Sequence, residues 1–141
     1  MGARKHNTAE KSKEAKKKLY FAKLNNCPSS PRKMRLVAEL IKGKNVELAL
    51  NILQHTPNYA SEKLFKLVKS AIANWQQKNE GVRMEDSHLF ISQVMVDEGR
   101  MLKRVQPAPQ GRAHRIRKRS NHVTVIIESR VSQEETKVVT K

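Results

Sequence analysis

The sequence is poor in cysteine, aromatic residues and acidic residues, and it contains no long apolar run. Cys27 is its single cysteine, which excludes an internal disulfide and leaves no second thiol for a structural zinc site. The longest bulky apolar run lies around Val123 to Ile127 and is interrupted by Thr124, far short of the roughly 20 residues that a membrane span requires. The charged N-terminus leads into no apolar stretch with a cleavage site, so a secretory signal is not expected. We therefore expect a cytosolic chain with no membrane partner, in which Cys27 is a small, reduced side chain.

Residue combinations that carry catalysis or bind cofactors are also missing. The five glycines are spread over the chain and form no phosphate-binding loop. The five histidines are scattered, and no pair has metal-ligand spacing with a cysteine or carboxylate partner. Asp97 and Glu98 are adjacent, so in a strand they point to opposite faces and do not form a carboxylate pair. The sequence therefore predicts no enzyme activity, no cofactor and no metal site.

Positive charge dominates what is present. Lys and Arg number 29 against 13 Asp and Glu, which gives a formal net charge of +16. Such an excess indicates a nucleic-acid partner. The length of 141 residues predicts one domain, whereas a mean hydropathy of −0.70 is low for a wholly buried chain. Part of the chain is therefore expected to gain its order from a partner.

The first 18 residues carry seven Lys or Arg, two Glu and only scattered Ala. Such a segment cannot bury enough apolar surface to offset the entropy lost on ordering. It is therefore predicted to be a flexible, basic extension over 1–18, mobile until an anionic partner captures it. A tail that only improves solubility is the alternative.

Three helices are predicted from the helical spacing of apolar residues. The first begins at Ser30–Pro31, where the serine side chain can cap a free amide and the proline suits the first helical position, and it stops at Gly43. The second, shorter helix has Asn45 as its cap. The third covers about 60–79 and has a steady apolar stripe that ends in Trp75. That tryptophan is expected to be an anchor in the core or at its rim rather than a base-stacking residue.

Strands are predicted where the apolar spacing changes to two. A short first strand is expected over 19–26. The segment HLFISQVMVDEG predicts a later strand that is covered on both faces, with Phe90 and Val94 on one face and Ile91 and Met95 on the other.

A long hairpin is predicted at about 99–119, before the last strand. Alternate residues from Arg115 to Arg119 are arginine, and the same strand face becomes apolar from Val123 onwards. The base of such a hairpin belongs to the sheet, and its outer half projects from the core. Its tip is expected at six residues that include two prolines without ladder donors and a conformationally free glycine: Gln106, Pro107, Ala108, Pro109, Gln110 and Gly111.

The hairpin has charge of one sign only. No Asp or Glu lies between Gly99 and Ile127, whereas eight cations do: Arg100, Lys103, Arg104, Arg112, Arg115, Arg117, Lys118 and Arg119. An isolated ribbon is marginal in water, so a polyphosphate partner is expected, with a solvated cationic face as the alternative. The absence of aromatics in this segment argues against a stacking platform for single strands. Folded, duplex-rich RNA or DNA is the expected ligand, and RNA is favoured because all three helices are needed for the core.

These observations predict an α+β fold with three helices packed on a small antiparallel sheet and a long protruding β-hairpin. A single RNA-binding domain is expected over 19–129, preceded by the extension over 1–18 and followed by a tail over 130–141.

Five motifs in order resemble one protein family: SSPRKMRLVAELIKGK, SAIANW, VDEG followed by LKR, GRA, and KRSNHVTVIIE. Over Leu24 to Glu128 the chain resembles the universal, bacterial-type large-subunit ribosomal protein family numbered twenty-two. The resemblance implies a non-enzymatic constituent of the cytoplasmic ribosome that binds several domains of large-subunit ribosomal RNA and supports assembly. It also implies that the hairpin lines the exit tunnel, with neighbouring ribosomal proteins and the nascent polypeptide as further partners. No homo-oligomer is expected.

The resemblance assigns RNA contacts to residues in the first helix, after it, and on both limbs of the hairpin: Ser30, Arg32, Lys33, Arg35, Lys42, Lys44, Lys103, Arg104, Arg112, Arg115, Lys118, Arg119 and His122. The charge pattern adds Arg100 and Arg117. His122 is equally well explained as a hydrogen-bonding strand residue. The residues from Gln106 to Arg112 would form the tip in the tunnel.

The chain departs from the family pattern at three places. Arg100 stands where proline often follows VDEG, Trp75 stands where alanine is usual, and the tip lacks two common cations. The tip's electrostatics therefore do not carry over from relatives. A free-standing regulator that binds duplex nucleic acid is the alternative function.

Overall fold

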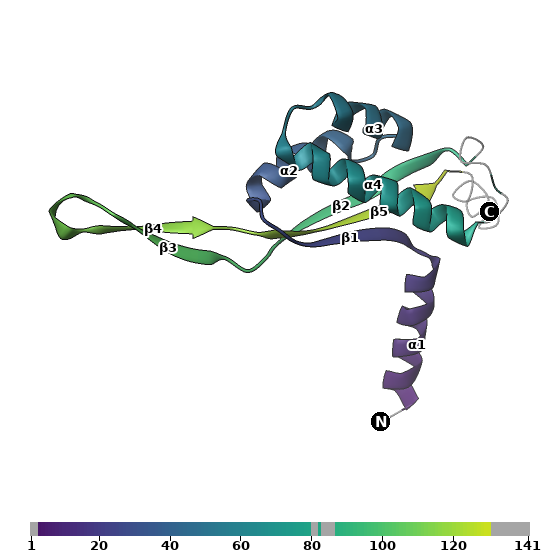
Figure 1. The fold of residues 1–141 in the computed structure, drawn as a ribbon. Helices are drawn as coiled ribbons and strands as arrows, with labels where there is room; N and C mark the ends of the chain where they lie inside the picture. The colour runs from purple at the N-terminus through teal and green to yellow at the C-terminus, as the bar shows by residue number, and fades with distance from the viewer. Residues whose placement is uncertain (1–2, 80–81, 83–86, 131–141) are drawn as a thin grey trace.

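A three-stranded antiparallel sheet with helices on one face forms the body of the protein, and a two-stranded ribbon projects from it (Figure 1). The computed structural model describes residues 3–79, 82 and 87–130. Its elements, in chain order, are α1 (Ala3–Lys18), β1 (Tyr20–Cys27), α2 (Pro31–Ile41), α3 (Val46–His55), α4 (Tyr59–Lys78), β2 (Leu89–Glu98), β3 (Leu102–Pro107), the 3₁₀ turn η1 (Pro109–Gly111), β4 (Ala113–Lys118) and β5 (Asn121–Ser129). The predicted α+β class is confirmed.

The last strand, β5, lies at the centre of the sheet, in the order β1-β5-β2. Alternate residues of β5 are fully buried against the helices, among them Val123, Val125 and Ile127. The helix α4 lies over β1 and β5, α2 lies over β2, and α3 packs on α4. The period of two in the sequence therefore marks the core-facing side of the strand.

A β-bulge in β2 corrects the predicted faces of that strand. The register shifts between Ile91, which pairs with Ile127, and Gln93, which pairs with Ile126. The extra residue moves Ile91 and Val94 onto the same, helix-covered face, because a shift of one residue reverses the sides of a strand. Met95 lies on the opposite face and is 41% exposed. The expectation that β2 is covered on both faces was therefore wrong.

The three predicted helices are present, and Trp75 is a core residue as expected. Trp75 is 3% exposed, and its ring meets the ring of Tyr20 edge-on with 6.4 Å between centroids. Pro31 occupies the first turn of α2, but the side chain of Ser30 makes no capping hydrogen bond. The carbonyl oxygen of Ser30 accepts the first helical hydrogen bond, from the amide of Met34. The predicted serine cap is therefore wrong, although the start of the helix is right.

A fourth helix, α1, stands where the sequence predicted a mobile tail. All its side chains that the structure describes are exposed, so the expectation that it buries little holds. Its Ala, Lys and Glu residues have high intrinsic helix propensity, which needs no burial. His6 and Glu10 also form an i,i+4 pair at 3.5 Å. Lack of burial therefore does not prevent this segment from being helical.

Candidate nucleic-acid interface

The strands β3 and β4 form a separate two-stranded ribbon, which extends away from the body (Figure 1). Each strand has six residues, so the ribbon is about 20 Å long at roughly 3.3 Å per residue. Every residue of β3 is exposed, as is every residue of β4 except the half-buried Ile116. The ribbon therefore has almost no core of its own, as expected from the sequence.

Both faces of the ribbon carry cations. Residues that pair across an antiparallel ladder share a face, and Lys103 pairs with Arg117 while Val105 pairs with Arg115. On the other face, Arg104 pairs with Ile116 and Leu102 pairs with Lys118. Lys103 and Arg117 thus place like charges directly opposite each other, an arrangement that destabilises a ribbon without a counter-charge.

The tip of the ribbon is a tight turn at the predicted place. Gln110 and Gly111 have φ of 61° and 69°, in the left-handed region. The amide of Ala108 donates to the carbonyl oxygen of Arg112 at 2.8 Å. Pro107 pairs with Ala113 at the end of the ladder, so the turn itself is shorter than the six residues predicted from sequence.

The ribbon joins the body at a neck formed by residues 99–101 and 119–120. The amide of Gly99 donates to the carbonyl oxygen of Ser120 at 2.9 Å, and the Ser120 hydroxyl donates to the carbonyl oxygen of Arg100. A Cβ at position 99 would lie 2.7 Å from Ser120 Oγ and 3.1 Å from His122 Nε2. The two limbs therefore approach so closely that only glycine fits at position 99 without movement of its neighbours.

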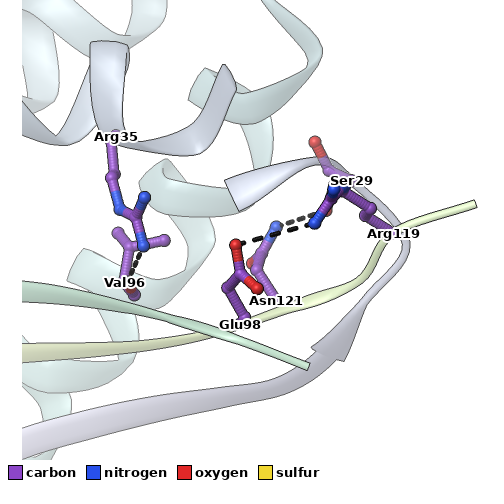
Figure 2. Close-up of polar contacts among 6 residues, drawn as sticks. All are labelled: Ser29, Arg35, Val96, Glu98, Arg119 and Asn121. Carbon is purple, nitrogen blue, oxygen red and sulfur yellow. Dashed lines mark hydrogen bonds and ion pairs between the residues drawn. The ribbon is translucent and has the colours of Figure 1, made fainter. Parts of the chain in front are cut away.

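Polar contacts fix the neck to the body (Figure 2). Arg119 and Glu98 form an ion pair at 3.7 Å. The side-chain amide of Asn121, which is fully buried, donates to the carbonyl oxygen of Ser29 at 2.7 Å. Arg35 donates to the carbonyl oxygen of Val96 at 3.1 Å. The first contact joins the neck to the end of β2, and the other two hold the start of α2 against β5 and β2 beside the neck.

A groove of about 970 Å³ lies beside the neck, and we call it the neck groove. Its walls come from the end of β1, the starts of α2 and α4, and both limbs of the hairpin. The lining residues are Asn26, Pro28, Ser29, Ser30, Lys33, Leu36, Asn58, Tyr59, Ala60, Arg100, Leu102, Arg117, Lys118, Arg119 and Ser120. Five of these residues are Lys or Arg, and none of the described lining residues is Asp or Glu. The neck groove is therefore a concave, cationic surface suited to phosphate.

The predicted RNA contacts fall into four places. Those in the neck groove are Ser30, Lys33, Arg100, Arg117, Lys118 and Arg119. Those farther out on the ribbon are Lys103, Arg104, Arg112 and Arg115. The residues predicted as the tip in the tunnel lie at the end of the ribbon: Gln106, Pro107, Ala108, Pro109, Gln110, Gly111 and Arg112. Lys42 and Lys44 follow the last turn of α2, about 16 Å from its start at roughly 1.5 Å per residue.

The remaining predicted residues lie on the body. Arg32 is exposed in the first turn of α2. Arg35 is exposed and bonds Val96, so it also has a structural contact. His122 accepts a hydrogen bond at Nδ1 from the amide of Asn26 at 3.1 Å, which is the strand hydrogen-bonding role that the sequence left open.

Sequence reasoning missed Asn58, Tyr59 and Leu36 as parts of the groove. Tyr59 is 54% exposed at the first position of α4, and the ammonium of Lys63 lies 5.0 Å from its ring centroid. The only sign of it in the sequence is that Tyr59 stands directly before the apolar stripe of α4. It could not be used because the sequence does not show that the start of α4 meets the hairpin.

Cys27 lies near this region at the end of β1 and is 3% exposed. Burial raises the pKa of its thiol, and the charge of Lys63 lowers the pKa by a smaller amount. The thiol is therefore neutral in the fold and packs as a small apolar group, as predicted from the sequence.

Comparison with known families decides where the chain belongs. A family model described as ribosomal protein L22p/L17e matches residues 22–128. The chain is a member of the ribosomal protein L22p/L17e family. The match spans most of the sheet, α2 to α4 and the whole hairpin. Membership of the L22p/L17e family makes the chain a ribosomal protein and not an enzyme, which confirms both the resemblance and the predicted absence of catalysis.

Curated L22p/L17e relatives are similar over nearly their whole length. Large ribosomal subunit protein uL22 of Flavobacterium psychrophilum is 63% identical over 129 residues, which are 92% of this chain and 94% of the relative. The protein of the same name from Christiangramia forsetii is 61% identical over 127 residues, 90% of this chain and 94% of the relative. That from Bacteroides fragilis is 55% identical over 135 residues, 96% of this chain and 98% of the relative.

The described part of the L22p/L17e chain shows no membrane-spanning helix and no metal site. Within residues 3–79, 82 and 87–130, no helix has the length and apolar character needed to cross a membrane. The same described residues contain no cluster of His, Cys, Asp or Glu that could hold a metal ion.

Proposed function

We propose that this chain is a structural constituent of the large ribosomal subunit in the cytoplasm. It binds large-subunit ribosomal RNA through the ribbon and the neck groove, supports assembly of the subunit, and places the ribbon along the nascent-peptide exit tunnel. Neighbouring ribosomal proteins and the nascent polypeptide are the further partners. Family membership supports the ribosomal role, and the residue-level contacts rest on the charges described above.

The observation that carries the proposal is the exposed ribbon with cations on both faces. Lys103 and Arg117 oppose each other across the ladder, and the described ribbon residues include no acid to neutralise them. RNA supplies phosphates on every side of a narrow channel, so a ribbon with two cationic faces can be neutralised all round. A flat RNA surface would neutralise only one face.

Sedimentation tests the ribosomal role. The chain, produced in a bacterium in place of the resident relative, is expected to co-sediment with large-subunit particles and to remain there at moderate salt. Its presence only in the soluble fraction would favour the alternative, a free-standing regulator that binds duplex nucleic acid.

A charge reversal tests the role of the ribbon. We expect Arg115→Glu to reduce incorporation into particles, because it introduces a negative charge on an exposed ribbon face. Lys69→Glu is the matched control, since it changes the net charge equally on the exposed side of α4. Equal incorporation of the two variants would contradict the assignment of the ribbon as an RNA contact. Circular dichroism checks that both variants remain folded.

A further inference from the structure

We propose that the neck groove binds an unpaired nucleotide of the RNA, with the base stacked on Tyr59 and its phosphates held by the surrounding cations. This inference rests on the proposed function and deepens it, because it distinguishes one nucleotide-specific contact from general phosphate binding along the ribbon.

Apolar and cationic groups share one concave surface in the neck groove. Leu36, Tyr59 and Leu102 line the groove and are 62%, 54% and 52% exposed. Paired RNA presents phosphates and sugars to a protein and keeps its base faces stacked inside the helix. Cations alone would suffice for paired RNA, whereas three exposed apolar side chains among them match the face of a base that has left its stack.

The neck groove is large enough for a nucleotide. The volume of about 970 Å³ is at the upper end of the roughly 300–1,000 Å³ range of small-molecule sites, so a nucleotide can enter. The ammonium of Lys63 lies over the Tyr59 ring and adds positive charge beside the stacking surface. Base stacking on an aromatic side chain next to a cationic groove is the usual arrangement for unpaired nucleotides.

Hydrogen-bond donors and cations surround the Tyr59 ring in the groove. The helices α2 and α4, of 11 and 20 residues, both begin at the groove, and neither Ser30 nor Asn58 caps its helix with its side chain. The first amides of a helix have no partner within the helix and favour an anion. Together with Lys33, these helix starts supply phosphate contacts on the α-helical wall of the groove. The wall formed by the hairpin supplies Arg100, Arg117 and Lys118.

Asn121 keeps this wall in place. Its side-chain amide holds the carbonyl oxygen of Ser29, directly before α2, so the start of α2 is fixed relative to the neck. A pre-formed site loses less entropy when a nucleotide enters than a site that must first be ordered.

The test compares two RNA hairpins that differ by one nucleotide: one is fully paired, and the other carries a single additional, bulged 2-aminopurine nucleotide. The full chain is titrated into each at the same salt concentration. We expect about tenfold tighter binding of the bulged hairpin, in line with the stacking of one base on an aromatic side chain. We also expect quenching of the 2-aminopurine fluorescence, because the base stacks on Tyr59.

Substitutions at position 59 assign the effect to the ring. Tyr59→Phe keeps the preference and the quenching, whereas Tyr59→Leu removes both and leaves the affinity for the paired hairpin within about twofold. Phe21→Leu is the matched control, because Phe21 is also partly exposed but lies outside the groove. Circular dichroism confirms the helical content of each variant.

The outcomes separate this inference from the proposed function. Equal binding of both RNAs, or a preference that survives Tyr59→Leu, overturns the nucleotide site and leaves general RNA binding intact. Failure of the chain to bind either RNA overturns the proposed function itself.

Discussion

Lys103 lies directly opposite Arg117 in the ladder between β3 and β4, and both residues are exposed. The two cations share a face of a ribbon that has almost no buried side chain. Their repulsion is a cost in the free protein, and phosphate binding removes it. The same pair therefore opposes stability in the free protein and favours it in the complex.

Lys103→Glu is expected to separate these two effects. It replaces the repulsion by a cross-strand ion pair with Arg117, which stabilises the free ribbon by about 0.2–1 kcal/mol. It also weakens RNA binding, because a phosphate contact becomes a repulsion. Amide hydrogen exchange of β3 and β4 measures the first effect, and RNA titration at several salt concentrations measures the second.

Lys103→Gln is the control for that prediction. It removes the repulsion without forming an ion pair, and the slope of log affinity against log salt should become shallower by about 0.7–0.9 for the lost phosphate contact. Unchanged or tighter RNA binding by Lys103→Glu would show that this side of the ribbon does not meet phosphate.

Gly99→Ala is expected to destabilise the neck by about 1–3 kcal/mol, as overpacking does in tight sites. The added Cβ would lie 2.7 Å from Ser120 Oγ and 3.2 Å from the carbonyl carbon of Ser120. Thermal unfolding measures the loss. The double variant with Ser120→Ala should recover part of it, because the hydroxyl is the nearest obstacle. No recovery relative to Gly99→Ala would place the strain elsewhere.

Lys78→Met is expected to loosen α1 without affecting the core. The Lys78 ammonium donates to the carbonyl oxygens of Lys17 and Leu19 at 3.0 and 2.9 Å, which stabilises the C-terminal end of α1. Loss of these two exposed hydrogen bonds, worth about 1 kcal/mol together, should speed amide exchange in α1 about fivefold. Lys69→Met is the matched control on the same helix, because its ammonium contacts Phe65 instead. Equal exchange in both variants would show that the carbonyl contacts do not hold α1.

Cys27 is expected to react slowly with iodoacetamide in the folded protein, with a pH profile displaced to higher pH. Burial raises the pKa of this thiol above its ordinary value, so the reactive thiolate forms only at higher pH. The folded state therefore disfavours the thiolate. The contribution of the neutral thiol to folding stability is complete below the pKa that Cys27 has in the unfolded chain, and it is lost as pH rises through the raised pKa of the folded state. Lys63→Met should displace the profile further, because the charge of Lys63 lowers the pKa.

The chain unfolded in urea is the control for the thiol, and it should show an ordinary cysteine profile. Identical profiles in the folded and unfolded states would mean that the thiol is not shielded by the fold.

The elements that the sequence predicted well have strong local signals. The apolar stripe that ends in Trp75 specifies both α4 and its buried face, because one helical period serves both. The ribbon was predictable from charge, since a strand face that changes from cationic to apolar cannot lie wholly in a core. These signals need no information about distant segments.

The features that the sequence did not reveal depend on pairing between distant segments. The bulge after Ile91 shows only in the register with β5, and no residue in HLFISQVMVDEG marks it. The neck groove unites Tyr59 with Arg117, which are far apart in sequence and meet only through the fold. The helix α1 was missed for a different reason. Its lack of apolar surface predicted a mobile tail, whereas the high helix propensity of its residues favours a helix.

The two basic projections leave opposite ends of the sheet. The helix α1 joins β1 at Tyr20, which pairs with Ile127, whereas the hairpin joins the sheet where Asn121 pairs with Glu98 (Figure 1). A polyanion that reaches both ends is held bivalently, and the first attachment raises the local concentration for the second. Deleting α1 should therefore shorten the residence time of the chain on a long folded RNA, yet hardly alter its binding to a short fragment that reaches only the ribbon.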